Sequence, residues 1–312
     1  MKPICLAVGV LIACSSVARA DDKPLDQVLA DCDQAAASPF DNTRPAGVAG
    51  VRAENIVADS AVRACELAAS AAPNDARIAM QLGRAYLAAK NFDAAASQFV
   101  RASENGSAQA AADLALLYMN GRDGFRRDDV EAVRLSRLAA YRGNAQGQNG
   151  LGFLFIEGRG GLQKDEAEAA RLFKLAADQG YPPAQNNLGH LYQAGRGGLA
   201  KDEQEAVRLY KLAAGQNYAP AQASLGVNYL YGLGGLPKDE VEAVRLFALS
   251  SDQGSALGQA SLARAYESGQ GGLAKDESEA KRLYKLAADQ GDAYAQRALA
   301  RLSGGEAAPP TK

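Results

Sequence analysis

The sequence contains no tryptophan, one histidine and four cysteines among 312 residues, and only 6% of its residues are aromatic. So few histidines and cysteines offer no set of side chains for a tetrahedral zinc site. The lone histidine also has no evident nucleophile and orienting acid beside it for a catalytic triad. We therefore expect no catalytic residue, no metal and no cofactor.

The chain also lacks a strong net charge of either sign. The 34 Lys and Arg residues nearly balance the 36 Asp and Glu residues, for a net charge of −2, and the two signs alternate along the chain. Because nucleic-acid binding needs clustered basic residues, we expect no nucleic-acid partner. Beyond residue 20 no apolar run is long enough to cross a bilayer, so we expect no transmembrane helix in the mature chain.

The chain does contain a repeat. An aspartate recurs every 37 residues and opens the phrase D-x-x-E-A-x-R-L each time; these aspartates are Asp128, Asp165, Asp202, Asp239 and Asp276. A fixed period of this length is typical of a solenoid, in which each unit is one pair of elements stacked on the next. The repeat therefore favours binding over chemistry as the function.

Each unit has the pattern of two helices. In residues 184–220, Leu188, Leu191 and Tyr192 have the spacing of a helix with one buried face, which we call helix A. Asp202 is a suitable N-cap for the second helix, helix B, and Glu205 three residues later completes a capping box. The five recurring Asp and Glu pairs are therefore expected to be helix caps and not catalytic pairs.

The remaining repeated positions predict how helix B packs and ends. We expect Leu209, Tyr210 and Leu212 on its buried face, and Arg208 in an ion pair with Glu205 on its exposed face. Helix B ends at residues that tolerate the left-handed conformation: Gly143, Gly180, Asn217, Gly254 and Gly291. A small residue recurs within helix A at Ala115, Gly152, Gly189, Gly226 and Ala263. Because glycine costs up to about 1 kcal/mol relative to alanine inside a helix, its recurrence predicts a closely crossing neighbour.

The phrases LGHLYQAGRGG and DEAEAARLFKLAADQG resemble the Sel-one-like repeat, a relative of the tetratricopeptide repeat, over roughly residues 110–302. The resemblance implies an all-α fold: a right-handed superhelical solenoid of antiparallel helix pairs, with helix A on its concave face. We expect five such repeats over 110–294 and a capping helix over 295–302, followed by a disordered tail over 303–312.

Upstream of these repeats, residues 75–109 resemble a tetratricopeptide unit. Residues 21–74 are expected to hold two more helices, at about 25–38 and 54–72, joined by a long loop rich in proline and glycine. Cys32 and Cys65 lie in these two helices, and we predict a disulfide between them that closes a loop of about 33 residues. Two buried free thiols are the alternative.

Residues 1–20 have the features of a secretory signal peptide. Lys2 precedes a short apolar stretch, and Ala18-Arg19-Ala20 offers a small-x-small cleavage site. We expect cleavage after Ala20 and a periplasmic or secreted protein. The alternative is a lipoprotein anchored through Cys14, because Leu11-Ile12-Ala13-Cys14 resembles a lipoprotein box.

Two polar residues stand out inside the repeats. His190 occupies a position that is Leu, Phe, Val or Arg in the other units, which favours a tolerated, partly exposed site over a pH-sensing or ligand role. Asn228 replaces an apolar residue, so it either hydrogen-bonds locally or forms a polar spot on the wall of the groove. The GRGG segments lack the lysine and hydroxyl residue of a phosphate loop and are expected to be turns.

The concave face of such a solenoid typically binds peptides or folded proteins. We predict partner contacts at positions that vary between units beside the repeated stripe: Asn149, Phe153, Asn186, Asn187, His190, Ser224, Val227, Ser261 and Arg264. The function expected is a non-enzymatic periplasmic adaptor for a protein partner in the cell envelope. Similar exported Sel-one-like proteins in bacteria include regulators that hold a membrane sensor kinase inactive, as in exopolysaccharide control, which is the sharper form of this expectation.

The alternative function is a cell-wall-related enzyme or ligand binder that acts on peptidoglycan or β-lactams. Some cysteine-rich Sel-one-like proteins have that role, and they carry a cysteine pair in nearly every repeat. The five repeats here contain no cysteine, which is a departure from that group.

Overall fold

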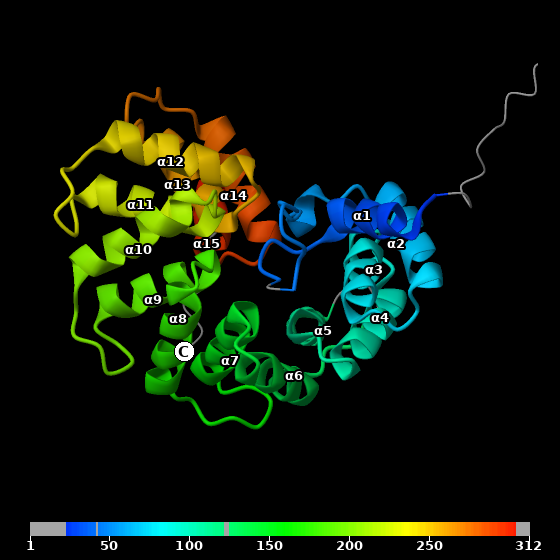
Figure 1. Cartoon of the computed structure of the whole chain (residues 1–312). Coiled ribbons are helices and arrows are strands. Elements are labelled where there is room, and N and C mark those ends of the chain that lie inside the picture. Colours follow the sequence, from blue (N-terminus) through cyan, green and yellow to red (C-terminus); the bar gives the residue numbers. More distant parts are fainter. Residues whose placement is uncertain (1–22, 42, 122–124, 304–312) are drawn as a thin grey trace, which may run out of the picture.

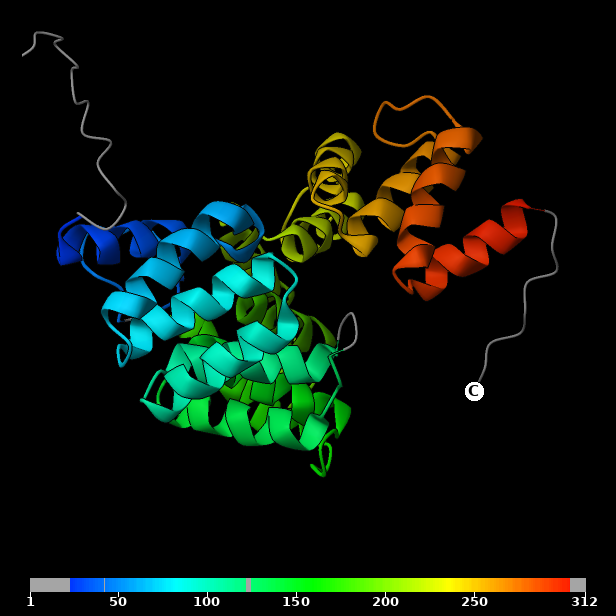
Figure 2. The same cartoon turned by 90° about the vertical axis from the view of Figure 1, so that its right-hand side faces the viewer.

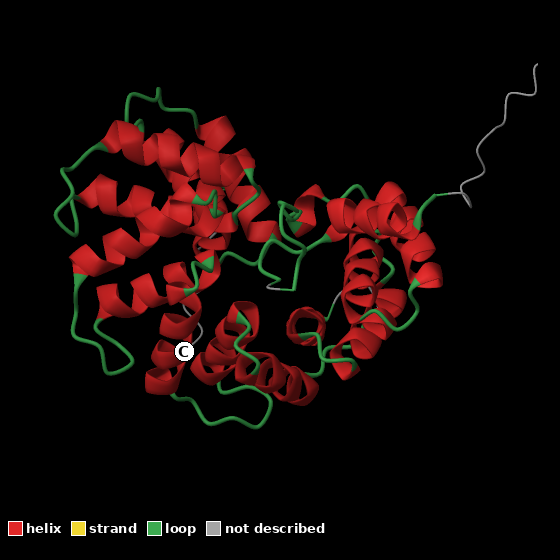
Figure 3. Cartoon of the chain, viewed as in Figure 1, coloured by secondary structure: helices red, strands yellow, loops and turns green. Residues whose placement is uncertain are grey.

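The computed structural model describes residues 23–41, 43–121 and 125–303. These residues form fifteen α-helices and one short 3₁₀ helix, and no strand occurs among them (Figure 3). The predicted all-α class is therefore confirmed. The predicted signal peptide, the alternative lipid anchor at Cys14 and residues 304–312 of the predicted tail lie outside the described residues.

The helices follow one another at short intervals along the whole described chain. Their bounds are α1 Leu25–Ala36, η2 Ala53–Asn55, α2 Ala58–Ala71, α3 Ala76–Ala88, α4 Phe92–Glu104, α5 Ala108–Asn120, α6 Asp129–Tyr141, α7 Ala145–Glu157, α8 Glu166–Asp178, α9 Pro182–Ala194, α10 Glu203–Gly215, α11 Ala219–Tyr231, α12 Glu240–Asp252, α13 Ala256–Ser268, α14 Glu277–Asp289 and α15 Ala293–Leu302. The odd-numbered helices α5 to α13 are the A helices of the five repeats, and α6 to α14 are the B helices.

Consecutive helices pack as antiparallel pairs, and each pair packs on the next. The A helices α5, α7, α9, α11 and α13 also contact one another in sequence order. The array curves through a broad arc in Figure 1, while Figure 2 shows that the arc is part of a superhelix, because α15 lies well away from α1. The predicted right-handed solenoid is confirmed.

The aspartate at the start of each helix B is an N-cap, as predicted, but the capping box is not formed. Asp202 accepts a hydrogen bond from the Glu205 amide at 2.9 Å. The Glu205 carboxylate, however, accepts two bonds from Arg208, both at 2.7 Å, and the Asp202 amide donates to the Tyr192 carbonyl of helix A at 2.9 Å. The expected hydrogen bond from the Asp202 amide to the Glu205 carboxylate is therefore absent. The Asp202 amide instead bonds to helix A, and the Glu205 carboxylate forms an ion pair with Arg208.

The small residues of helix A face an aromatic ring on helix B of the same repeat. A β-carbon at Gly189 would lie 2.6 Å from Tyr210, and Gly226 faces Phe247 at the same distance. The predicted close crossing is thus present, and the neighbour is a ring rather than backbone. Leu212 was wrongly expected on the buried face: its side chain is 44% exposed. At 3.6 residues per turn it points about 120° away from Ala206, which is fully buried.

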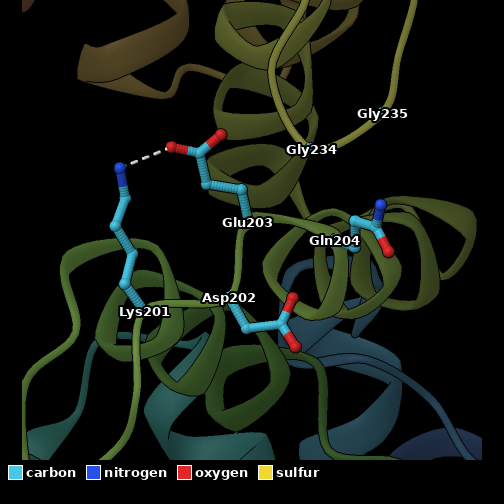
Figure 4. Close-up of a pocket in the computed structure, with 6 residues that line it drawn as sticks. All are labelled: Lys201, Asp202, Glu203, Gln204, Gly234 and Gly235. Atoms are coloured by element: carbon cyan, nitrogen blue, oxygen red, sulfur yellow. Dashed lines mark ion pairs between the residues drawn. The ribbon is translucent and has the colours of Figure 1, made fainter.

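The glycine-rich connections are turns, as expected, and they also join successive repeats. Gly197 has φ of +67°, and a β-carbon there would lie 2.6 Å from the Glu166 carbonyl oxygen of the preceding repeat. Figure 4 shows the equivalent junction of Gly234 with the start of α10, where Lys201 and Glu203 form an ion pair of 2.6 Å. This junction is an open polar hollow of about 360 Å³, lined in part by glycine backbone.

The N-terminal helices are joined by the predicted disulfide. Cys32 of α1 and Cys65 of α2 are both fully buried and form a disulfide. The described residues between the two helices are 37–41 and 43–57, and they include η2. Within the described ranges, no helix is both long and apolar enough to cross a membrane.

Candidate functional site on the inner face

The inner face of the curve is formed by the A helices. Residues of α5 and α9, together with Tyr218 just before α11, line one common cavity although the hairpin of α7 and α8 separates α5 from α9 in the chain. Helices that share a cavity across that distance must lie on the concave side. One equivalent position on each A helix forms a central row along this face: Leu116, Phe153, His190, Val227 and Arg264.

Three of the predicted contact residues form one network around His190. Ser224 Oγ lies 3.3 Å from Asn186 Oδ1 and 3.4 Å from His190 Nε2. His190 Nδ1 lies 2.9 Å from the Tyr210 hydroxyl. The imidazole is thus held on both sides by neighbouring helices. It presents a fixed face to the trough.

Burial lowers the pKa of His190 below its ordinary value. His190 is exposed by surface area, yet the protein atoms around the imidazole disfavour its charged form. At neutral pH the imidazole is therefore neutral, with one ring nitrogen as donor and the other as acceptor, and each nitrogen already faces a hydroxyl partner.

The other predicted residues lie in smaller groups. Asn187 donates to Asn149 of the preceding repeat at 3.0 Å, and Phe153 lies under the guanidinium of Arg159 at 5.9 Å. Val227 and Ser261 are half-buried on the same inner helices. The nine positions therefore form no single site. They spread along the trough, with the network at His190 at its middle.

Sequence analysis missed Tyr231, which lies one turn beyond Val227 and is 50% exposed. Arg264 of the next repeat donates a hydrogen bond to its hydroxyl at 2.6 Å, and the guanidinium lies 5.9 Å from the ring centroid. The sequence could have revealed this residue, because the equivalent position is Asn, Glu, Ala or Ser in the other units and only here a tyrosine.

Asn228 does not form a polar spot on the groove wall. Its side chain is 1% exposed, its amide donates to the Ser224 carbonyl at 2.8 Å, and its oxygen accepts from Gln193 at 3.2 Å. The buried amide is therefore satisfied locally, which was the first of the two interpretations of the sequence.

The segment between α1 and α2 lies on the inside of the curve and covers part of the trough (Figure 1). Phe40 packs edge-on against Tyr181 at 5.0 Å, and Arg52 donates to the Gln216 carbonyl at 2.5 Å. Arg84 of α3 donates to the Ala36 and Val51 carbonyls at the base of the segment. We call residues 37–41 and 43–52 the inner loop. Its composition predicted a loop but gave no sign of this position.

A cavity of about 660 Å³ lies between the inner loop and the A helices. Tyr181 and Tyr218 form part of its wall, and they stand at the N-cap positions of α9 and α11. Their side chains make no cap hydrogen bond, whereas Ser107 and Asn144 at the equivalent positions do. Proline in the first turn of α9 and α11 favours the helical conformation there and compensates for the missing cap.

Asp113 of α5 also lines this cavity, and it was not among the predicted residues. Its Oδ1 accepts from Gln109 at 3.0 Å and from Gln146 at 2.8 Å. Burial raises the pKa of the carboxyl group, and the charge of Arg84 opposes that rise. Asp113 replaces Gly, Asn or Ser at the equivalent position of the other repeats, so the same search for variable positions could have found it.

In the part of the chain that the structure describes, no three His, Cys, Asp or Glu side chains gather closely enough to hold a metal ion. The candidate functional surface is therefore a curved trough with one cavity under a loop. Such a surface has the shape and the side chains for binding a partner or a small ligand.

Comparison with known proteins identifies the repeat. The Sel1 repeat family matches residues 108–144, 145–181, 182–218, 219–255 and 256–292, which together exceed half of the chain. No curated protein matches the sequence.

Two solved structures are similar over most of the chain. One is a Sel1 repeat protein from Oxalobacter formigenes, with 28% identity and a TM-score of 0.61 over 74% of this chain and 92% of that one. The other is c5321, described as a protective antigen present in uropathogenic Escherichia coli strains, with 31% identity and a TM-score of 0.54 over 80% of this chain. The match spans 53% of c5321, about half of its length.

Proposed function

Because the chain belongs to the Sel1 repeat family, whose members are generally protein-interaction scaffolds, we propose that it is a non-enzymatic adaptor that binds a protein partner on its inner face. The observation that carries the proposal is the open part of the trough over α9, α11 and α13. There His190, Tyr231 and Arg264 present one imidazole, one phenol and one guanidinium on neighbouring helices.

These side chains suit a protein interface. Tyrosine and arginine are enriched among the residues that contribute most to binding, because each combines a large contact area with directional hydrogen bonding. Tyr231 and Arg264 are already held by each other, so they lose little freedom when a partner binds. The fold places them on the helices next to that of His190, because α9 contacts α11 and α11 contacts α13.

We further propose that the adaptor acts in the cell envelope. The Cys32–Cys65 disulfide supports it, since structural disulfides persist in oxidising compartments. The signal-like residues 1–20 support it independently. A membrane sensor that controls an envelope or exopolysaccharide process is the partner that the family resemblance suggests.

Affinity capture with quantitative mass spectrometry tests the proposal. The mature chain is immobilised and exposed to envelope extract, beside Arg264→Ala on the inner face and Arg245→Ala on a B helix. We expect one protein whose recovery falls about tenfold with Arg264→Ala and is unchanged with Arg245→Ala, because Arg245 is engaged only in an exposed pair with Glu242. Recovery of no specific protein, or equal losses with both variants, would contradict it.

A further inference from the structure

The charge of the inner face changes along the array. The A helices α9 and α11 contain no Asp, Glu, Lys or Arg residue. The next A helix, α13, contains Arg264 and Glu267. The final helix, α15, contains Arg297 and Arg301 and no acidic residue. We call α13 and α15 the basic end, because they hold three arginines against one carboxylate.

All three arginines occupy repeat positions that lie on the inner face in earlier units. Arg301 follows Arg264 by one period of 37 residues, so it extends the central row onto α15. Arg297 follows Asn186 by three such periods. Arg297 and Arg301 are also four residues apart, which places them side by side on one face of the helix. Because α15 ends the described array (Figure 2), Arg297 is exposed there.

The single carboxylate neutralises only one of these arginines. Glu267 accepts a hydrogen bond from Arg301 at 2.5 Å and another from the Tyr284 hydroxyl at 3.0 Å. Arg264 donates to the Tyr231 hydroxyl instead. Among the described residues, the ion pair of Arg301 with Glu267 involves neither of the other two arginines, and no carboxylate is paired with them. Two guanidiniums of the basic end therefore lack an acidic partner within the described chain.

Tyrosines border these guanidiniums. Tyr231 is 50% exposed and Tyr294 is 43% exposed. The hydrogen bond to Tyr231 raises the pKa of Arg264. Tyr284 and Tyr294, whose ring centroids are 6.0 Å apart, lie near this guanidinium and also near that of Arg301. The arginines are thus grouped around one aromatic cluster that is partly open to solvent.

Such a group is suited to carboxylates. The planar fork of a guanidinium binds a carboxylate through two parallel hydrogen bonds. Arg264 is already held by Tyr231, so it loses little freedom when it binds. The whole chain has a net charge of −2, so the excess of positive charge is confined to this end and is not part of a general basic surface.

We propose that the basic end binds an acidic segment of the protein partner, with Arg264 and Arg297 paired to its Asp or Glu side chains. The inference rests on the proposed adaptor function and adds the chemistry of the partner. The uncharged helices α9 and α11 take the remainder of the partner, while the acidic segment fixes its position at the end of the trough.

Fluorescence anisotropy on the unaltered chain provides the first test. The probe is a short rhodamine-labelled peptide of alternating glutamate and glycine, and the same peptide with glutamine in place of glutamate is its neutral analogue. Oligogalacturonate with the same label and a matched number of carboxylates represents an acidic polysaccharide. We expect the glutamate peptide to bind at least about tenfold more tightly than the glutamine peptide and more tightly than the oligogalacturonate.

The second test uses Arg264→Gln and Arg297→Gln, each of which removes one guanidinium. We expect either substitution to weaken binding of the glutamate peptide by about fivefold or more. Arg134→Gln is the matched control, because Arg134 lies on α6 at a distant part of the array and is engaged in an exposed pair with Glu131. Its affinity should equal that of the unaltered chain. Circular dichroism melts report folding, and the exposed Arg297 can be replaced without disturbing the core.

The outcomes separate the possibilities. Selective binding of the glutamate peptide that falls with Arg264→Gln and Arg297→Gln, and not with Arg134→Gln, supports the inference. Equal binding of the glutamate and glutamine peptides, no binding of either, or equal losses with all three variants would overturn it. Tighter binding of oligogalacturonate would also overturn it and assign the basic end to an acidic polysaccharide.

The inference and the adaptor proposal fail in different ways. Capture of a protein partner together with equal binding of the glutamate and glutamine peptides would contradict only the acidic segment. Selective binding of the glutamate peptide at the basic end, with no protein captured from envelope extract, would contradict the adaptor proposal and leave the basic end as a site for acidic peptides.

Discussion

Gly189→Ala tests the packing that holds each hairpin together. The added β-carbon would lie 2.6 Å from Tyr210 Cε1, 3.0 Å from Cδ1 and 3.1 Å from Cζ. Tyr210 is fully buried, and its hydroxyl contacts His190 and Gln193, so the ring cannot move freely. Overpacking of this kind typically costs about 1–3 kcal/mol, against a gain of about 1 kcal/mol from replacing a helical glycine with alanine.

Gly215→Ala is the matched control, because Gly215 is also helical and a β-carbon there meets nothing within 4 Å. We expect this variant to be more stable by about 0.5–1 kcal/mol. The difference between the two variants isolates the clash, and it should be about 1–3 kcal/mol. Urea denaturation followed by circular dichroism measures it. Equal stabilisation by both substitutions would refute the packing argument.

Three further predictions concern the disulfide, the inner loop and the histidine. Replacing Cys32 and Cys65 with serine should destabilise the N-terminal helices by about 3–4 kcal/mol, seen as faster hydrogen exchange in α1 and α2; unchanged exchange would contradict this. Phe40→Ala should speed hydrogen exchange in the inner loop and leave α13 and α14 unchanged; retained protection would show that the contact with Tyr181 does not hold the loop. His190 should titrate by NMR below the ordinary histidine pKa of about 6.5. Because the unfolded chain then binds the proton more readily, stability should fall as pH drops through that value, and a normal or raised pKa would contradict the account.

Features that recur in every repeat could be predicted from the sequence. The aspartate caps, the left-handed Asn217 and the small residue opposite Tyr210 each satisfy a local requirement of the backbone or of one hairpin. Such requirements act between residues close in sequence. Because the same residue types recur in every repeat, they can be told apart from chance occurrences. The fold of the repeats was therefore predictable, and so was the exposure of Leu212, because it lies about 120° around the helix from the buried Ala206.

The inner loop could not be predicted in the same way. The contact of Arg52 with Gln216 joins residues 164 positions apart and occurs once, so no period reveals it. The two hydrogen bonds from Arg84 to the base of the loop also occur only once among the described residues, so they too lack a repeat. Asp113 lies between these cases. Its departure from the repeat was visible in the sequence, whereas the charges of Asp41 and Arg84 near it were not.

The central claim is that a partner protein occupies the inner face. Site-specific photocrosslinking in intact cells tests it most directly, with benzoyl-phenylalanine placed at either of two exposed tyrosines. Tyr231 lies on the inner face and is 50% exposed, whereas Tyr141 ends a B helix and is 92% exposed. We predict a crosslink to one envelope protein from position 231 and none from position 141. A crosslink to that protein from position 141 alone, or from neither position, would contradict the account.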